Sequence, residues 1–268
     1  MINFQRIIKY FAMFLSFLII FGITSGVIGC LVVIGDIFSS KKETTGNVVS
    51  QTFNNFKIEM ELNYADLIIK DGETLKLTSL ENTIVTEEDN GVLKIKENNY
   101  PFSFKKKRNT VTLEVPRNII YDEVKINSAS GSITIDSLNA QVLSLDLGAG
   151  VTTINNINIK DNCSVSTGAG KFSILNGSIN NLVFDMGIGE SLITALLTGD
   201  SKINSSIGKL KLNVLGPSSD YNLQVNKGVG TINVNGVSVL DGYATSGGSN
   251  SILVNGDIGL VDISFTQN

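Results

Sequence analysis

The chain has 268 residues, a formal net charge of −4 and an isoelectric point near 5.0, so it lacks the basic surface that nucleic-acid binding requires. It contains no His and no Trp, and its arginines are Arg6, Arg108 and Arg117. Without His, the sequence excludes Ser-His-Asp and Cys-His catalysis and most zinc sites.

The N-terminal stretch is strongly apolar. Residues 10–35 carry no charge over 26 positions, and about 20 apolar residues suffice to span a bilayer. Arg6 and Lys9 precede this run, which favours a cytoplasmic N-terminus and an external C-terminal domain. We therefore expect residues 1–38 to form a cytoplasmic tip and a single-pass transmembrane signal-anchor helix in the cell membrane.

Two alternatives concern the same segment. Val27-Ile28-Gly29-Cys30 resembles a bacterial lipobox, which would make Cys30 a lipidated N-terminus, but Leu-Val-Val-Ile follows where a mature lipoprotein usually turns polar. Ordinary secretory cleavage is the second alternative. Gly22 and Gly26 have the spacing that allows close helix packing and self-association, although glycine is also simply common in membrane helices.

Residues 39–52 are rich in Ser, Lys, Thr, Gly and Asn and predict a polar linker to an extracytoplasmic β-domain over residues 53–268. Less regular strands are expected over residues 53–122, where apolar residues at 56, 58, 60 and 62 alternate with charged ones and Pro116 ends a strand. No helical period follows residue 40.

A basic cluster lies between two of these strand patterns, at the expected tip of a loop: Lys105, Lys106, Lys107 and Arg108. A solvated loop is the ordinary explanation. The functional alternative is contact with anionic lipid headgroups or wall polymers.

Residues 123–268 repeat one short β unit. Taking the second glycine of each Gly-x-Gly as reference, the spacings are 19, 20, 19, 19, 22 and 29 residues, a period typical of a solenoid. We expect the reference glycines to form structural corners, because a chain that turns needs positive φ or close backbone approach. They are Gly131, Gly150, Gly170, Gly189, Gly208, Gly230 and Gly259.

Aliphatic residues recur four positions after these glycines, and both flanks alternate with period two. The pattern predicts an all-β fold, a β-solenoid or stacked short-strand sheets of about 19–22 residues per coil, with equivalent side chains in columns. Ile135, Ile154, Ile174 and Ile193 should form one such column. The two longer spacings are explained as loop insertions at residues 216–220 and 236–250.

Reactive constellations are not found. Cys163 takes a column position and should be a buried core residue. Asp146 and Asp185 share an outward row with Asn127, Ser166, Asn204 and Asn226, which indicates a polar ladder on a wet face and offers few carboxylates for calcium. The Gly-x-Gly motifs lack the third glycine and βαβ unit of a dinucleotide site. We expect no catalytic residue, cofactor or metal; a carbohydrate-acting enzyme is the remaining alternative.

One family shows this order of motifs. Ala65-Asp66-Leu67-Ile68-Ile69-Lys70-Asp71-Gly72, then Gly91-Val92-Leu93-Lys94-Ile95, then Val111-Thr112-Leu113-Glu114-Val115-Pro116 precede the Gly-x-Gly coils. The chain resembles, over residues 50–265, the bacterial putative-adhesin family of β-strand repeats, also called the toast-rack domain. The resemblance implies a stacked-strand fold on the cell envelope and no catalytic residues. Ser206-Ile207-Gly208 and Asp257-Ile258-Gly259 depart from the pattern, so their coils are expected to bend differently or to form the cap.

Together these features predict a membrane-anchored, externally displayed, non-enzymatic adhesin or interaction scaffold for envelope proteins or wall polymers. The alternative, which the resemblance also implies, is an accessory or sensor of an envelope-stress response. Neighbouring genes for a histidine kinase or phage-shock-type membrane proteins would favour the latter.

Overall fold

The structure, a computed structural model, describes residues 49–54, 56–80, 83–98 and 108–266, which belong to one unit, Gly46–Asn268. The expected membrane segment and Lys105 to Lys107 lie outside the described residues. Within the described part of the chain, none of the helices has the length and hydropathy needed to span a bilayer. The helical element there is η1, a 3-10 turn at Ser218–Asp220.

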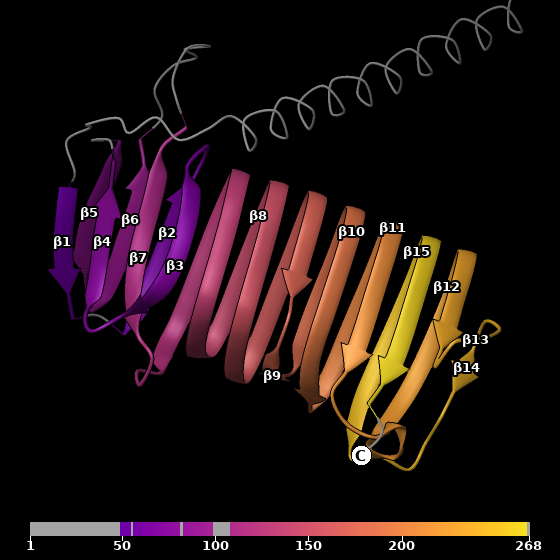
Figure 1. The fold of residues 1–268 in the computed structure, drawn as a ribbon. Coiled ribbons are helices and arrows are strands. Elements are labelled where there is room, and N and C mark those ends of the chain that lie inside the picture. The colour runs from indigo at the N-terminus through magenta and orange to yellow at the C-terminus, as the bar shows by residue number, and fades with distance from the viewer. Residues whose placement is uncertain (1–48, 55, 81–82, 99–107, 267–268) are drawn as a thin grey trace, which may run out of the picture. The chain divides into compact units, whose positions relative to one another are not determined.

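The fold is all-β, a stack of parallel strands that bend round from one face of the stack to another (Figure 1). All the strands belong to one 15-stranded hydrogen-bonded sheet. The stack is built from β8 (Tyr121–Ile174), β9 (Gly177–Asn180), β10 (Leu182–Thr198), β11 (Asp200–Val214), β12 (Tyr221–Val234) and β15 (Asn250–Phe265). Two short strands lie against its C-terminal end, β13 (Val237–Ser238) and β14 (Tyr243–Ala244).

The N-terminal part continues the stack with shorter strands. These are β1 (Val49–Phe53), β2 (Lys57–Leu62), β3 (Asp66–Gly72), β4 (Leu75–Ser79), β5 (Ile84–Asp89), β6 (Val92–Glu97) and β7 (Thr110–Pro116). Parallel pairing joins β2 and β3 to β8 on one side, and to β6 and β7 on the other.

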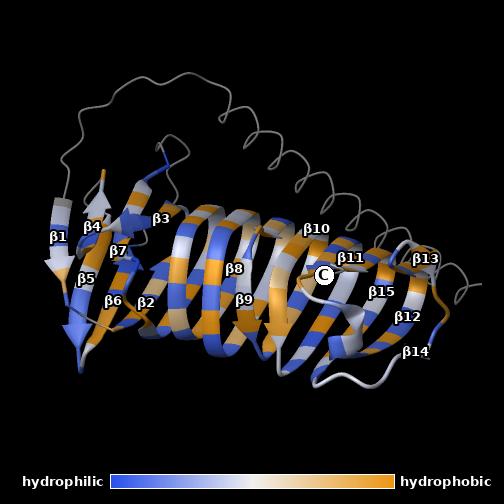
Figure 2. Ribbon diagram, turned by 60° about the horizontal axis from the view of Figure 1, so that its bottom comes forward, coloured by the Kyte–Doolittle hydropathy of each residue, from blue (hydrophilic) through white to orange (hydrophobic). Residues whose placement is uncertain are grey.

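In the long strands of the stack, the alternation in the sequence places apolar side chains inward and polar ones outward, visible as striped colouring in Figure 2. The predicted aliphatic column is present: Ile193 pairs with Ile174 and with Leu212, and Ile135 pairs with Ile69. These side chains are buried. Each contributes roughly 1.5–3 kcal/mol to the stack, so the core depends on neighbouring coils covering one another.

The order of the coils differs from the order of the sequence at the C-terminal end. β15 lies between β11 and β12, pairing in parallel with both, so that Gly259 is in register with Gly208 and with Gly230. The 29-residue spacing is therefore more than a loop insertion, because residues 235–249 carry the chain back into the stack. The coils around Gly208 and Gly259 are interior neighbours, and the expectation that they form a cap is wrong.

The N-terminal end shows the same exchange, in which the order of the coils in space differs from their order in the sequence. β2 and β3, the first coil in sequence, lie between the coil of β6 and β7 and the beginning of β8. At each end, the terminal coil of the chain is therefore the second coil in space. The coil next to it in the sequence lies outside it in the stack and covers it.

Antiparallel strands close both ends of the parallel stack. β5 pairs with β6, and β4 joins β7 to β1. At the other end β13 and β14 pair with two ends of β12, at Val234 and Val225 respectively. Such covering strands limit edge-to-edge pairing with other chains.

Candidate functional site

The Gly-x-Gly motifs form a continuous edge of the stack, which we call the glycine edge. Gly189 illustrates its geometry: φ is +143° and a Cβ there would overlap the backbone carbonyl oxygen of Gly170 in the next coil. The seven reference glycines all have φ between +134° and +159°. Neighbouring backbones thus approach too closely at these seven positions for a Cβ.

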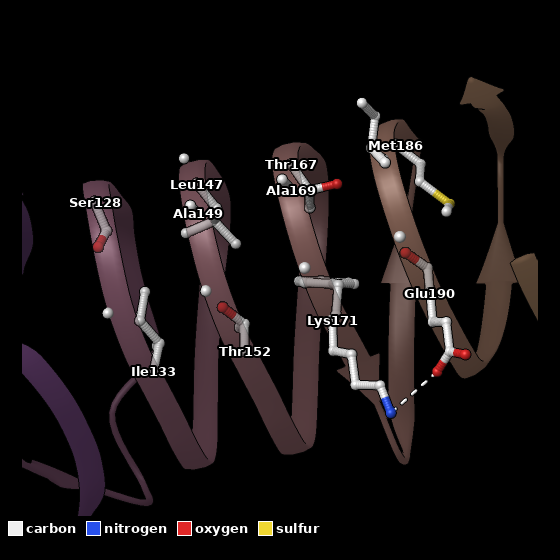
Figure 3. A pocket seen from close by; sticks show the side chains of 18 residues that line it. Ser128, Ile133, Leu147, Ala149, Thr152, Thr167, Ala169, Lys171, Met186 and Glu190 are labelled. Carbon is white, nitrogen blue, oxygen red and sulfur yellow. Dashed lines mark ion pairs between the residues drawn. The ribbon is translucent and has the colours of Figure 1, made fainter. Parts of the chain in front are cut away.

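The inner side of the glycine edge is packed by large and small residues in alternation. Phe172 is in register with Ser191, and its ring lies 5.3 Å from the ring of Phe184. A small hollow remains between the bends, lined among others by Thr152 and Phe172 (Figure 3). Its volume of about 20 Å³ holds roughly one water molecule and is far below the ~300–1,000 Å³ of small-molecule pockets.

The outer side of the glycine edge carries the middle residue of each motif. Ile188 is in register with Ala169 on one side and Ile207 on the other, and Ile207 with Ile258. Next to them Lys171 Nζ pairs with Glu190 Oε2 at 3.0 Å (Figure 3). The sequence analysis used the glycines and overlooked these residues, although the apolar middle position is visible in the motifs.

A polar ladder runs along an outward row. Asn204 donates to Asp185, Asn255 donates to Asn204 at 2.7 Å, and Asn226 donates to Asn255 at 2.7 Å. The predicted row of Asp185, Asn204 and Asn226 is therefore brought together, with Ser166 in register with Asp185. Asn255 was overlooked, although it lies four residues before Gly259 just as Asn204 lies four before Gly208; the sequence hides only that its coil lies between the other two.

The first coil bends without glycine. Its corner is Asn63-Tyr64-Ala65, and Oε2 of Glu97 accepts hydrogen bonds from all three backbone amides at 2.7, 2.8 and 3.0 Å. A carboxylate that accepts hydrogen bonds from three backbone N–H groups replaces the acceptors that a neighbouring coil would otherwise supply.

Arg108 is the described member of the basic cluster. Its Nη1 lies 3.2 Å from Oδ1 of Asp66, which also accepts the amide of Ser132 at 2.8 Å. Arg108 thus joins the segment directly before β7 to the first coil.

Cys163 is buried in the position that the pattern predicted, in register with Leu182. Burial raises the pKa of its thiol to about 12, so it stays protonated at neutral pH. Burial likewise raises the pKa of Tyr121 to about 12. The described residues hold no group of three or more His, Cys, Asp or Glu side chains placed to bind a metal ion.

Comparison with solved structures finds matches that cover most of this chain at low sequence identity. A putative cell adhesion protein from Clostridium sporogenes has 20% sequence identity and a TM-score of 0.36, the match covering 82% of this chain and 99% of that one. A putative adhesin from Bacteroides fragilis has 12% identity and a TM-score of 0.41, covering 85% and 98%. A putative adhesin from Parabacteroides merdae has 12% identity and a TM-score of 0.36, covering 84% and 99%.

The search for relatives among curated proteins finds no match. The model of the Toastrack DUF4097 family matches residues 54–258, which run from the N-terminal coils through the polar ladder to Ile258 in β15. The chain belongs to the Toastrack DUF4097 family.

Proposed function

We propose that this protein is a membrane-anchored, externally displayed, non-enzymatic scaffold that binds envelope proteins or wall polymers in the manner of an adhesin. The observation that carries the proposal is the polar ladder from Asp185 to Asn226. Its amide and carboxylate groups repeat at the strand spacing of about 4.8 Å. An extended polymer with regularly spaced polar groups could bind along such a row.

The ladder supports binding because its groups are already ordered. The amide of Asn204 accepts from one neighbour and donates to the other, which fixes its orientation. Binding to a preorganised row loses little side-chain entropy, so many weak hydrogen bonds can add up.

Anchoring and display are supported by the sequence. Residues 10–35 are uncharged and follow Arg6 and Lys9, the arrangement that places the following domain outside the cytoplasm. A non-enzymatic role is supported by the lack of His and by the protonated, buried thiol of Cys163.

Photo-crosslinking in intact cells tests the binding role. A photo-reactive residue at Ser166, an exposed position of the ladder row, should capture envelope proteins or wall polymers. The matched control is the same residue at Lys160, also exposed but outside that row. Equal capture at both positions, or none at Ser166, would contradict the proposal.

Thiol labelling tests the display separately. Ser164→Cys places an exposed thiol next to the buried Cys163. A membrane-impermeant maleimide should label this variant on intact cells and leave the parent protein unlabelled. Labelling that requires cell lysis would place the domain inside the cell.

A further inference from the structure

Four large aliphatic side chains lie in one line on the outer side of the glycine edge. We call Ile188, Ile207, Ile258 and Val229 the aliphatic ridge; they are 58%, 43%, 52% and 75% exposed. Ile188 is in register with Ile207, Ile207 with Ile258, and Ile258 with Val229. At a strand spacing of about 4.8 Å, the ridge is roughly 14 Å long.

The bend itself does not require an apolar residue here. The equivalent position in the first regular coil is Ser130, whose hydroxyl donates to the backbone oxygen of Asn63. Single exposed aliphatic residues are ordinary on protein surfaces. Four consecutive coils that each place one on the same line form a contiguous patch, which is typical of an interaction site.

The shape of the ridge argues against a protein partner. A standard protein interface uses about 20–30 residues on each side, and its strongest contacts are usually Trp, Tyr or Arg. The ridge offers four narrow aliphatic side chains on a convex bend, flanked by charged residues. A second copy of the chain would bury too little area on this line alone to form a stable dimer.

A lipid bilayer needs no matching shape, and aliphatic side chains transfer favourably into its apolar region. Lysines flank the ridge at Lys209, one residue after Gly208, and at Lys227, one residue before Gly228; among the described residues neither has a carboxylate within ion-pair distance. Their long side chains can reach headgroup phosphates while the ridge lies deeper.

If the proposed anchor is correct, it also keeps the domain near a membrane, attached through β1 at the end of the stack opposite to the ridge. Residues 36–48 join the uncharged segment to the described strands, and 13 extended residues reach at most about 45 Å. We propose that the aliphatic ridge inserts into the interfacial region of a lipid bilayer, a proposal that rests on the proposed anchoring for its proximity. The domain then lies along the membrane by its glycine edge.

The test uses the full chain reconstituted in vesicles of phosphatidylcholine and phosphatidylglycerol. In a Cys30→Ser, Cys163→Ala background, Ile207→Cys and Ile258→Cys carry an environment-sensitive fluorophore. Matched controls are Val183→Cys and Leu196→Cys, exposed aliphatic positions off the ridge. The ridge labels should shift to the blue and be quenched several-fold more by brominated acyl chains than the control labels.

Three results would overturn the proposal: equal acyl-chain quenching at ridge and control positions, unchanged aqueous quenching of the ridge labels when lipid is added, or ridge-to-ridge disulfides linking two copies. Vesicle flotation after alkaline washing reports on the anchor independently. A chain that floats while its ridge labels stay aqueous would reject the ridge proposal and retain the anchor. A chain that is washed off would reject the anchor.

A second measurement uses substitution of the ridge. Ile188→Ser with Ile207→Ser and Ile258→Ser, carrying the label at Thr231→Cys beside the ridge, should lose the lipid-dependent blue shift. The Val183→Ser, Leu196→Ser variant with the same label should keep it. Since the substituted side chains are exposed, both variants should fold. A shift that persists without the ridge aliphatics would overturn the proposal.

Discussion

Asn255 donates a 2.7 Å hydrogen bond to Oδ1 of Asn204, although 51 residues separate the two along the chain. Asn226 donates in turn to Asn255 at 2.7 Å. The last coil is therefore held between two coils that are consecutive in sequence. Pairings of such high sequence separation require the closure of long loops before they stabilise the fold. The C-terminal end should therefore form more slowly than the stack of β8 to β11.

Asn255→Ala should lower the free energy of unfolding by about 1–3 kcal/mol, because it removes two hydrogen bonds worth about 0.5–1.5 kcal/mol each. Urea denaturation followed by circular dichroism measures the change. Asn162→Ala, at an exposed position, serves as control and should stay within about 0.5 kcal/mol of the parent. Equal effects of the two substitutions would show that the ladder contributes nothing.

Truncation after Ser249 tests the exchanged order of the coils. It removes β15, through which β12 is joined in parallel to the rest of the stack. Limited proteolysis with mass spectrometry should then find residues 217–249 cleaved as one stretch while β8 to β11 resist. In a stack built in sequence order, β12 would instead stay protected on β11, and that outcome would contradict the observed order.

Gly189→Ala and Gly247→Ala separate two reasons for glycine. Both positions have positive φ, +143° and +118°, but a Cβ at 189 would overlap the Gly170 carbonyl whereas one at 247 meets nothing within 4 Å. Gly247→Ala should cost about 1–3 kcal/mol of backbone strain. Gly189→Ala should lower the free energy of unfolding by more than about 4 kcal/mol or prevent folding, as measured by thermal and urea unfolding. Similar losses at both sites would mean that close backbone approach is unimportant.

The repeat pattern was sufficient to predict the core. The burial of Ile174, Ile193 and Leu212 follows from alternation and period alone, because each coil presents the same face to its neighbour. The same equivalence hides the order of the coils. Since Val225, Val254 and Ile203 are interchangeable in a column, no local signal tells which coil will neighbour β11.

The candidate surfaces were predictable to different degrees. The polar row could be read from the repeat, since Asp185, Asn204 and Asn255 each lie four residues before a reference glycine, whereas the order in which its members pair required the coil order. The aliphatic ridge follows from the geometry of the bend, where the residue before each reference glycine points outward, whether a glycine also precedes it, as at Ile188, or not, as at Ile207. That direction depends on three-dimensional curvature, so spacing in the sequence could not reveal it.

Alkaline pH should destabilise the fold through two buried groups. Burial raises the pKa of Cys163 from 9.0 and of Tyr121 from 10.0, each to about 12. The folded protein therefore keeps two protons that the unfolded chain releases between about pH 9 and 12. The resulting stability is complete below about pH 9 and is lost as the pH rises toward 12.

Urea unfolding at a series of pH values from neutral upward measures this loss, and tyrosinate absorbance follows ionisation without interference because the chain has no Trp. A Tyr121→Phe, Cys163→Ala variant should be less stable at neutral pH and show a shallower decline above pH 9, since it lacks both groups. Burial also raises the pKa of Tyr221, so some slope should remain. Tyr64→Phe, at a position 62% exposed, is the control and should keep the full decline. An unchanged slope in the double variant would mean that neither buried group links folding to pH.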